Sequence, residues 1–268
     1  MSTPLIIELA TLAILIAATA AAWWSPGASP DKAFKLAGAA LLAAIGALVM
    51  ELGAEGWNAD LTFTLKVTVL ATLFAYVAIG SFSQRIQQLG VLVLPYSVLF
   101  GVFALIVGVL VAAPVVPPIA SVAWYDAHIV FALATYALLT LAAMAGLACL
   151  IQEAALKRKA TGGLSARLPA VTESEQAEIR LLAGAEIVLG VGIATGMALA
   201  WLEAKGLLPL DHKSILAIAA FLVIGALLLA HAQFGYRGRR AARWVMIAWL
   251  LLTLAYPGVK FVREILLQ

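Results

Sequence analysis

Three histidines are the residues of this sequence best suited to metal or proton chemistry, and each lies near the end of a long apolar segment: His128, His212 and His231. An imidazole nitrogen ligates iron and other transition metals, and the ring titrates near neutral pH. Ionisable groups inside a bilayer are costly, so those within apolar segments are functional candidates.

His231 and Glu186 form the first candidate pair. His231 lies about one helical turn from the end of a predicted helix over residues 212–234. Glu186 lies six residues, or about 9 Å, beyond Arg180 in the preceding predicted helix, so we expect the two side chains at similar depth. A carboxylate beside an imidazole orients the ring and raises its basicity, as it does for metal-ligating histidines. The alternative is a buried pair that only ties two helices together.

His128 is the second candidate and begins a predicted helix over residues 126–157. Small residues on its face leave room for a flat ligand or for a neighbouring helix. His128 and His231 are expected near opposite membrane faces, so they cannot ligate the same iron. His212 is a weaker candidate, because Asp211 followed by Ser214 is typical of a helix N-cap.

The remaining polar groups in apolar segments favour structural roles. Glu8, Glu51 and Lys66 are expected within about two turns of the membrane surface, where they can reach water or pair with one another. The chain has one cysteine, Cys149, in an apolar segment, so we expect no disulfide framework, no redox thiol pair and no cysteine-based metal site. A small apolar packing role is the expectation for Cys149.

The elements that carry these residues are apolar segments long enough to cross a membrane. The chain is 64% hydrophobic and 12% charged, which is too apolar for a soluble domain. Successive apolar segments of roughly 20 residues fit the hydrocarbon thickness of a bilayer. We therefore predict an all-α fold, a polytopic transmembrane bundle of about eight helices in a single domain over residues 1–268. The expected helices cover about 4–24, 35–52, 61–82, 90–113, 126–157, 180–204, 212–234 and 243–268, with the longest loop over 158–177.

Basic residues lie mainly in alternate loops, which indicates topology rather than nucleic-acid binding. Seventeen Lys and Arg stand against 14 acidic residues. Twelve of the basic residues fall in one set of loops and five in the other. Because basic loops are retained in the cytoplasm, both termini are predicted outside. The expected partner of the apolar helices is the lipid bilayer.

Several segments resemble one known family. They are LDHKSILAIAAFLVIGALLLAHAQFGYRGRR and LTLAYPGVKFV near the C-terminus, HIVFALATYALLTLAAMAGLACLIQEAALKRK around His128 and Tyr136, and VLVLPYSVLF further upstream. These segments resemble the cytochrome c assembly protein family (CcsA/CcmC-like), in particular its shorter YpjD-like and HemX-like inner-membrane branch. The resemblance reaches from about Gly90 to the C-terminus.

The resemblance implies heme as a cofactor. Known members move heme and present it for attachment to apocytochrome c, so His128 corresponds to a heme ligand at the outer surface and His231 to one inside the membrane. The sequence also departs from the family: GLLPLDHK contains no Trp, no His follows His231, and the second predicted helix has no His. A single-histidine site near His231 remains open. A methionine could complete the coordination of iron, and the candidates are Met50, Met144 and Met197.

The resemblance therefore implies a heme-handling protein of the cell inner membrane that takes part in cytochrome c maturation without bond-making chemistry and with no catalytic residue. Other membrane proteins of cytochrome c maturation are the expected partners. His231 is the expected principal heme contact and possible iron ligand, with Glu186 orienting it. One alternative is a regulatory or scaffolding protein linked to tetrapyrrole metabolism. Another is a small-solute or proton-coupled transporter, in which Glu186 and His231 relay protons.

Overall fold

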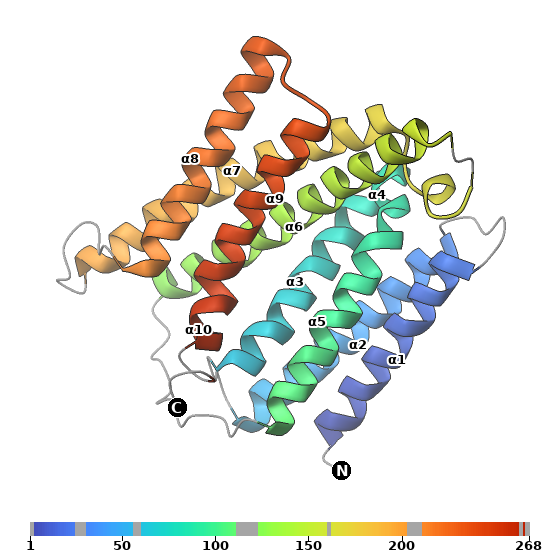
Figure 1. Cartoon of the computed structure of the whole chain (residues 1–268). Helices are drawn as coiled ribbons and strands as arrows, with labels where there is room; N and C mark the ends of the chain where they lie inside the picture. Colours follow the sequence, from blue (N-terminus) through green and yellow to red (C-terminus); the bar gives the residue numbers. More distant parts are fainter. Residues whose placement is uncertain are drawn as a thin grey trace. The chain divides into compact units, whose positions relative to one another are not determined.

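The computed structural model describes residues 3–24, 31–55, 60–110, 123–159, 162–202, 211–262 and 265, and these form helices joined by turns (Figure 1). The chain divides into two compact units. Unit 1 comprises Met1–Ile119 with Thr161–Pro169, and unit 2 comprises Ala120–Ala160 with Ala170–Gln268. The single transmembrane domain over residues 1–268 stays a prediction, because a division by contacts does not show whether either unit folds alone.

The described residues of unit 1 form four long helices and one short one. They are α1 (Thr3–Trp24), α2 (Asp31–Glu55), α3 (Leu61–Gly80), α4 (Gln84–Gln88) and α5 (Gly90–Leu110), followed by the isolated 3₁₀ turn Ser165–Arg167. α1, α2, α3 and α5 are each apolar and long enough to cross a bilayer.

Unit 2 contains the remaining long helices. They are α6 (Ala123–Lys157), α7 (Val171–Leu202), α8 (His212–Phe234) and α9 (Arg239–Thr253), after which the last helix continues through the π-helical turn η2 (Leu254–Gly258) into α10 (Val259–Phe261). Across the described residues eight segments are long and apolar enough to span a membrane. The prediction of an all-helical, multi-pass membrane protein is confirmed. The expected helix ends at residues 113, 204 and 268 lie outside the described residues.

The loop predicted over residues 158–177 is the main error of the sequence analysis. α7 begins at Val171, nine residues before the predicted start. At its first turn the Glu173 carboxylate accepts the N–H of Ala170 at 3.3 Å, and Ser174 and Glu178 are buried. α6 and α7 pack against each other more extensively than any other helix pair, side by side in Figure 1. Packing against α6 therefore extends α7 beyond its apolar segment. A prediction from hydropathy alone does not include such packing.

Pro95 leaves one backbone carbonyl of α5 without its helical donor, and Trp23 supplies a donor instead. Proline has no N–H, so Pro95 cannot donate to the carbonyl of Val91 one turn earlier. The indole Nε1–H of Trp23, at the end of α1, donates to that carbonyl at 2.9 Å. An unpaired carbonyl is costly in a membrane, where no water replaces the missing donor. The hydrogen bond that replaces the missing one in α5 therefore fixes the end of α1 against α5.

A second polar network ties α9 to α6 in unit 2. The indole of Trp249 donates to Thr140 Oγ1 at 3.1 Å. Thr253 Oγ1 donates to the Trp249 carbonyl at 2.8 Å, so it accepts the hydrogen bond from the Tyr136 hydroxyl at 3.3 Å. These bonds hold the end of α9, and with it the π-helical turn, beside the first half of α6.

We predict that Trp23→Phe destabilises the protein through the unsatisfied Val91 carbonyl, by about 1–3 kcal/mol. Pro95→Ala supplies the missing N–H, so Trp23→Phe should cost less in that background. Unfolding of the four proteins in detergent gives the double-mutant cycle, with the exposed Trp24→Phe as a control. An equal cost of Trp23→Phe in both backgrounds would contradict this account of the bond.

The side of the membrane on which the termini lie stays a prediction from loop charge. We expect Ser165→Cys, in a turn of the basic set of loops, to resist an impermeant thiol reagent in intact cells, and His212→Cys, which is exposed at the start of α8, to react. Cys149 is buried and should give little background. Labelling of Ser165→Cys but not of His212→Cys would show the opposite orientation and contradict the prediction.

Candidate functional site

A cavity of about 280 Å³ lies in unit 2, and His128 is part of its wall. α6 contributes His128 and Tyr136, α7 contributes the stretch from Leu189 to Met197, and α8 contributes its first turns. The π-helical turn completes the wall with Ala255 and Tyr256. Most of the lining is apolar. The cavity lies at the end of unit 2 where α6 and α8 begin, which is the predicted outer end.

The His128 ring is held by α7 through one of its two nitrogens. Nδ1 lies 3.0 Å from the carbonyl oxygen of Gly192 and 3.2 Å from Thr195 Oγ1. A carbonyl only accepts, so we assign the proton to Nδ1, which leaves Nε2 with its lone pair. Gly196 provides space for the ring, because a Cβ there would lie 3.0 Å from its Cε1. An imidazole held by Nδ1–H to a backbone carbonyl is the usual arrangement of a metal-ligating histidine.

Met197 is the methionine that the structure places beside His128, since both line the same cavity. Met50 belongs to α2 in unit 1. Met144 is buried on α6, sixteen residues from His128, which is about 24 Å of helix. The sequence offered no reason to choose among the three.

Asp211 and Lys213 line the same cavity at the start of α8. The Asp211 carboxylate accepts the N–H of Ser214 at 2.8 Å, which confirms the predicted N-cap. Partial burial alone would raise the pKa of Asp211, but the hydrogen bonds from Ser214 and the charges of Lys213 and His212 outweigh it and hold that pKa below its ordinary value. Asp211 is therefore ionised at neutral pH and fixes the turn that carries the Lys213 cation.

His231 lines a separate cavity of about 240 Å³ at the opposite end of unit 2. Arg180 and Glu175 of α7 and Arg237 share that wall. The His231 Nδ1 lies 3.0 Å from the carbonyl oxygen of Tyr236, just beyond the end of α8. The two histidines therefore lie in different cavities, as expected from their spacing.

The structure does not bring Glu186 and His231 together, so the expected pairing was wrong. Glu186 Oε1 faces Gly225 of α8, at 2.9 Å from the position that a Cβ would take there. Gly225 lies six residues before His231, about 9 Å along the helix. The depth of Glu186 had been counted from Arg180, whereas α7 begins at Val171. Among the described residues, Glu186 Oε2 is buried and has no hydrogen-bond partner.

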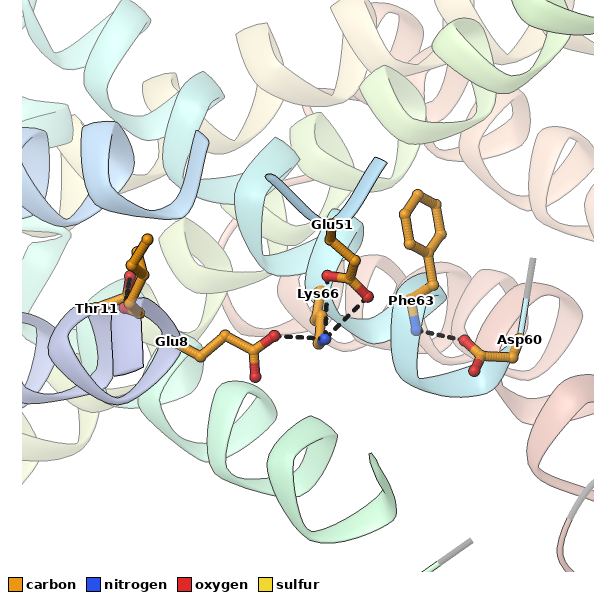
Figure 2. Close-up of polar contacts among 7 residues, drawn as sticks. Glu8, Thr11, Glu51, Asp60, Phe63 and Lys66 are labelled. Atoms are coloured by element: carbon orange, nitrogen blue, oxygen red, sulfur yellow. Dashed lines mark hydrogen bonds and ion pairs between the residues drawn. The ribbon is translucent and has the colours of Figure 1, made fainter. Parts of the chain in front are cut away.

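In unit 1, Lys66 joins three helices through two carboxylates (Figure 2). Its Nζ forms an ion pair with Glu8 of α1 and lies 3.1 Å from both carboxylate oxygens of Glu51 on α2. Of the two alternatives expected for these residues, reaching water or pairing with one another, the structure shows pairing. All three side chains are largely buried, and a small cavity of about 80 Å³ lies beside them. We assign them a structural role.

Sequence reasoning missed the π-helical turn and the part of the cavity that it forms. Pro257 lies within it and cannot donate a backbone N–H to the preceding turn. A π-helical turn inside an α-helix is often found at functional sites. Tyr256, Pro257 and Gly258 within an apolar segment do indicate an irregular turn in the last helix. The sequence did not show which other helix that turn would face.

We predict that Lys66→Met destabilises the protein by about 2–3 kcal/mol, a value between those of exposed and fully buried ion pairs, because it removes the cation that pairs with both Glu8 and Glu51. Glu8→Gln should cost less, since Glu51 keeps Lys66 paired. Denaturation of the detergent-solubilised protein would measure both, with the exposed Lys32→Met as the control. A cost of Glu8→Gln equal to that of Lys66→Met would show that the lysine depends on both partners.

Comparison with known proteins adds a family and one relative. A model of the cytochrome c assembly protein family matches residues 38–267. A protein of Azospirillum brasilense described as an uncharacterized 28.8 kDa protein in a nifR3-like 5′ region is 49% identical over 211 residues, which cover 79% of this chain and 78% of that protein. No solved structure matches the chain.

Proposed function

Because the chain belongs to the cytochrome c assembly protein family and so has a role in cytochrome c maturation, we propose that it binds heme in the cavity lined by His128 and hands it on. The observation that carries this proposal is a fixed imidazole and a methionine, His128 and Met197, in the wall of one largely apolar cavity. His128 is fixed through Nδ1 to the Gly192 carbonyl, and its Nε2 makes no hydrogen bond to the described part of the chain. A heme cargo would bring the iron that this nitrogen can ligate.

The residues of this cavity fit heme in type. Histidine and methionine are common axial ligands of heme iron, and His128 and Met197 line one cavity. Apolar walls suit the porphyrin rim, and Lys213 supplies a cation for a propionate. A volume of about 280 Å³ is near the lower end for small-molecule sites. The cavity would thus enclose only part of a porphyrin, which suits a protein that releases its cargo.

The proposed roles of the chain are to bind, orient and release. His128 would hold the iron, and Gly192 with Thr195 would keep the ring in place. Asp211, through its cap on α8, would keep Lys213 at the cavity. The proposal assigns no bond-making step to this chain. It places the protein in the cell inner membrane, with other membrane proteins of cytochrome c maturation as partners that deliver or receive heme.

We propose His231 as a second and weaker heme contact, reversing the order expected from the sequence. Its imidazole shares a wall with Arg180 and Arg237, whose guanidinium groups suit carboxylates such as heme propionates. Most of the residues in that wall are polar or charged, and they include the Glu175 carboxylate. Such a cavity is better suited to the charged edge of a heme than to its apolar ring.

Proton-coupled transport of a small solute is the second candidate function, and Glu186 favours it. Its carboxylate lies midway along α7, between the residues of the two cavities, with one buried oxygen unpartnered among the described residues. Intramembrane carboxylates of this kind often relay protons. In proteoliposomes with an imposed pH gradient, this function requires wild-type protein to speed the collapse of the gradient and Glu186→Gln to slow it. Equal rates would exclude Glu186 as a relay.

Heme titration of the purified protein tests the main proposal. We predict a Soret band for the wild type and its loss, or at least a tenfold weaker affinity, in His128→Ala. Met197→Leu should keep heme but alter the spectrum of its axial ligation. His231→Ala should weaken binding less than His128→Ala, and His212→Ala, which removes an exposed histidine, serves as the matched control.

Two results would contradict the proposed site. A Soret band that survives His128→Ala but disappears in His231→Ala would move heme to the other cavity. The absence of heme binding in the folded wild type would favour a regulatory or scaffolding role linked to tetrapyrrole metabolism.

A further inference from the structure

We propose that unit 2 also holds a divalent metal ion at the end opposite His128, ligated by Cys149 and Glu153 of α6 and by Glu175 and Glu178 of α7. This role differs from the packing role that the sequence alone indicated for Cys149. The site is separate from the principal heme contact, because Cys149 lies 21 residues from His128, about 32 Å along α6. It shares Glu175 with the wall of the His231 cavity, so it is tested on heme-free protein.

Three of the proposed ligand atoms already lie close together. The Cys149 Sγ and one carboxylate oxygen each of Glu153 and Glu175 lie within 4.8 Å of one another. Cys149 and Glu153 are one turn apart on α6, so they share a face. Tetrahedral zinc with bonds of about 2.0–2.3 Å sets its ligand atoms about 3.3–3.8 Å apart. Side-chain rotations that bring the three atoms together by about 1 Å would complete that geometry.

Glu178 is the independent observation that points to a bound cation. The residue is 1% exposed, and within the described residues its Oε1 has no hydrogen-bond partner. That oxygen points at α6, at 3.2 Å from the position of a Cβ on Gly146, which lies one turn before Cys149. A buried carboxylate without a partner is costly. A metal ion between Glu178 and Cys149 would supply the missing partner.

The start of α9 closes over the same carboxylates. Gly238 has φ +67°, and a Cβ there would lie 2.9 Å from Glu153 Oε1 and 3.3 Å from Glu175 Oε1. The N–H of Arg239 donates to Glu153 Oε1 at 3.1 Å, which leaves the second oxygen for an ion. Only glycine allows the backbone to approach both side chains in this conformation.

The donor set indicates the class of metal. Magnesium and calcium prefer oxygen ligands throughout, whereas a thiolate selects softer ions. One thiolate with three carboxylates suits Zn²⁺ and first-row ions such as Fe²⁺ and Co²⁺. Binding would release the thiol proton of Cys149, because the ligand is the thiolate.

Cobalt titration of the metal-stripped, heme-free full chain in detergent tests this site. We expect one Co²⁺ per chain with a thiolate-to-cobalt charge-transfer band, and displacement of that band by Zn²⁺. Cys149→Ser should remove the band, and Glu178→Gln should weaken Co²⁺ binding at least tenfold. Glu173→Gln is the matched control, because glutamine can still accept the Ala170 N–H outside the cluster.

Folding of each variant is checked by circular dichroism and size exclusion. If Cys149→Ser or Glu178→Gln does not fold, the half-buried Glu175→Gln replaces it and should weaken binding by a similar factor. The proposal is overturned if the folded wild type gives no charge-transfer band, if the band persists in Cys149→Ser, or if Glu173→Gln weakens binding as much as the cluster variants.

Discussion

The fold depends on one constraint: inside a bilayer every backbone and side-chain polar group must find its partner within the protein. Where a proline removes a donor from α5, the indole of Trp23 supplies one to the Val91 carbonyl. Where Pro257 interrupts the last helix, the chain takes a π-helical turn, and the end of α9 is tied to α6 through Thr253. That second interruption lies in the wall of the His128 cavity. The irregularities of these helices are thus places where another helix approaches.

Because of this constraint, buried polar groups that lack one or all of their hydrogen-bond partners indicate where a ligand could bind. His128 has one nitrogen held by α7 and one that makes no hydrogen bond to the described residues. Glu178 is buried beside Cys149 with an unpartnered oxygen. In contrast, the charges around Lys66 satisfy one another and so indicate helix packing in unit 1. Both candidate sites lie in unit 2, with His128 at one end and the carboxylates around Cys149 at the other.

The sequence predicted features set along one helix better than features set between helices. Apolar length located eight spans and both ends of α8, and residue type predicted the Asp211 cap. The extended start of α7 was missed because it packs on α6 without being apolar, and that error placed Glu186 opposite His231. How α6, α7 and the last helix face one another decides that Met197 lies beside His128 and that Cys149 lies near Glu175. Residue spacing along the sequence does not predict how those helices face one another.

The central claim is that His128 ligates heme iron, and a ligand exchange at this position tests it most directly. Resonance Raman spectra would be recorded for heme bound to the full-length wild type and to His128→Tyr. If His128 is the ligand, the exchange should replace the imidazole signature with a tyrosinate-to-iron charge-transfer signature. An unchanged imidazole spectrum in His128→Tyr would contradict the account, because another histidine would then hold the iron.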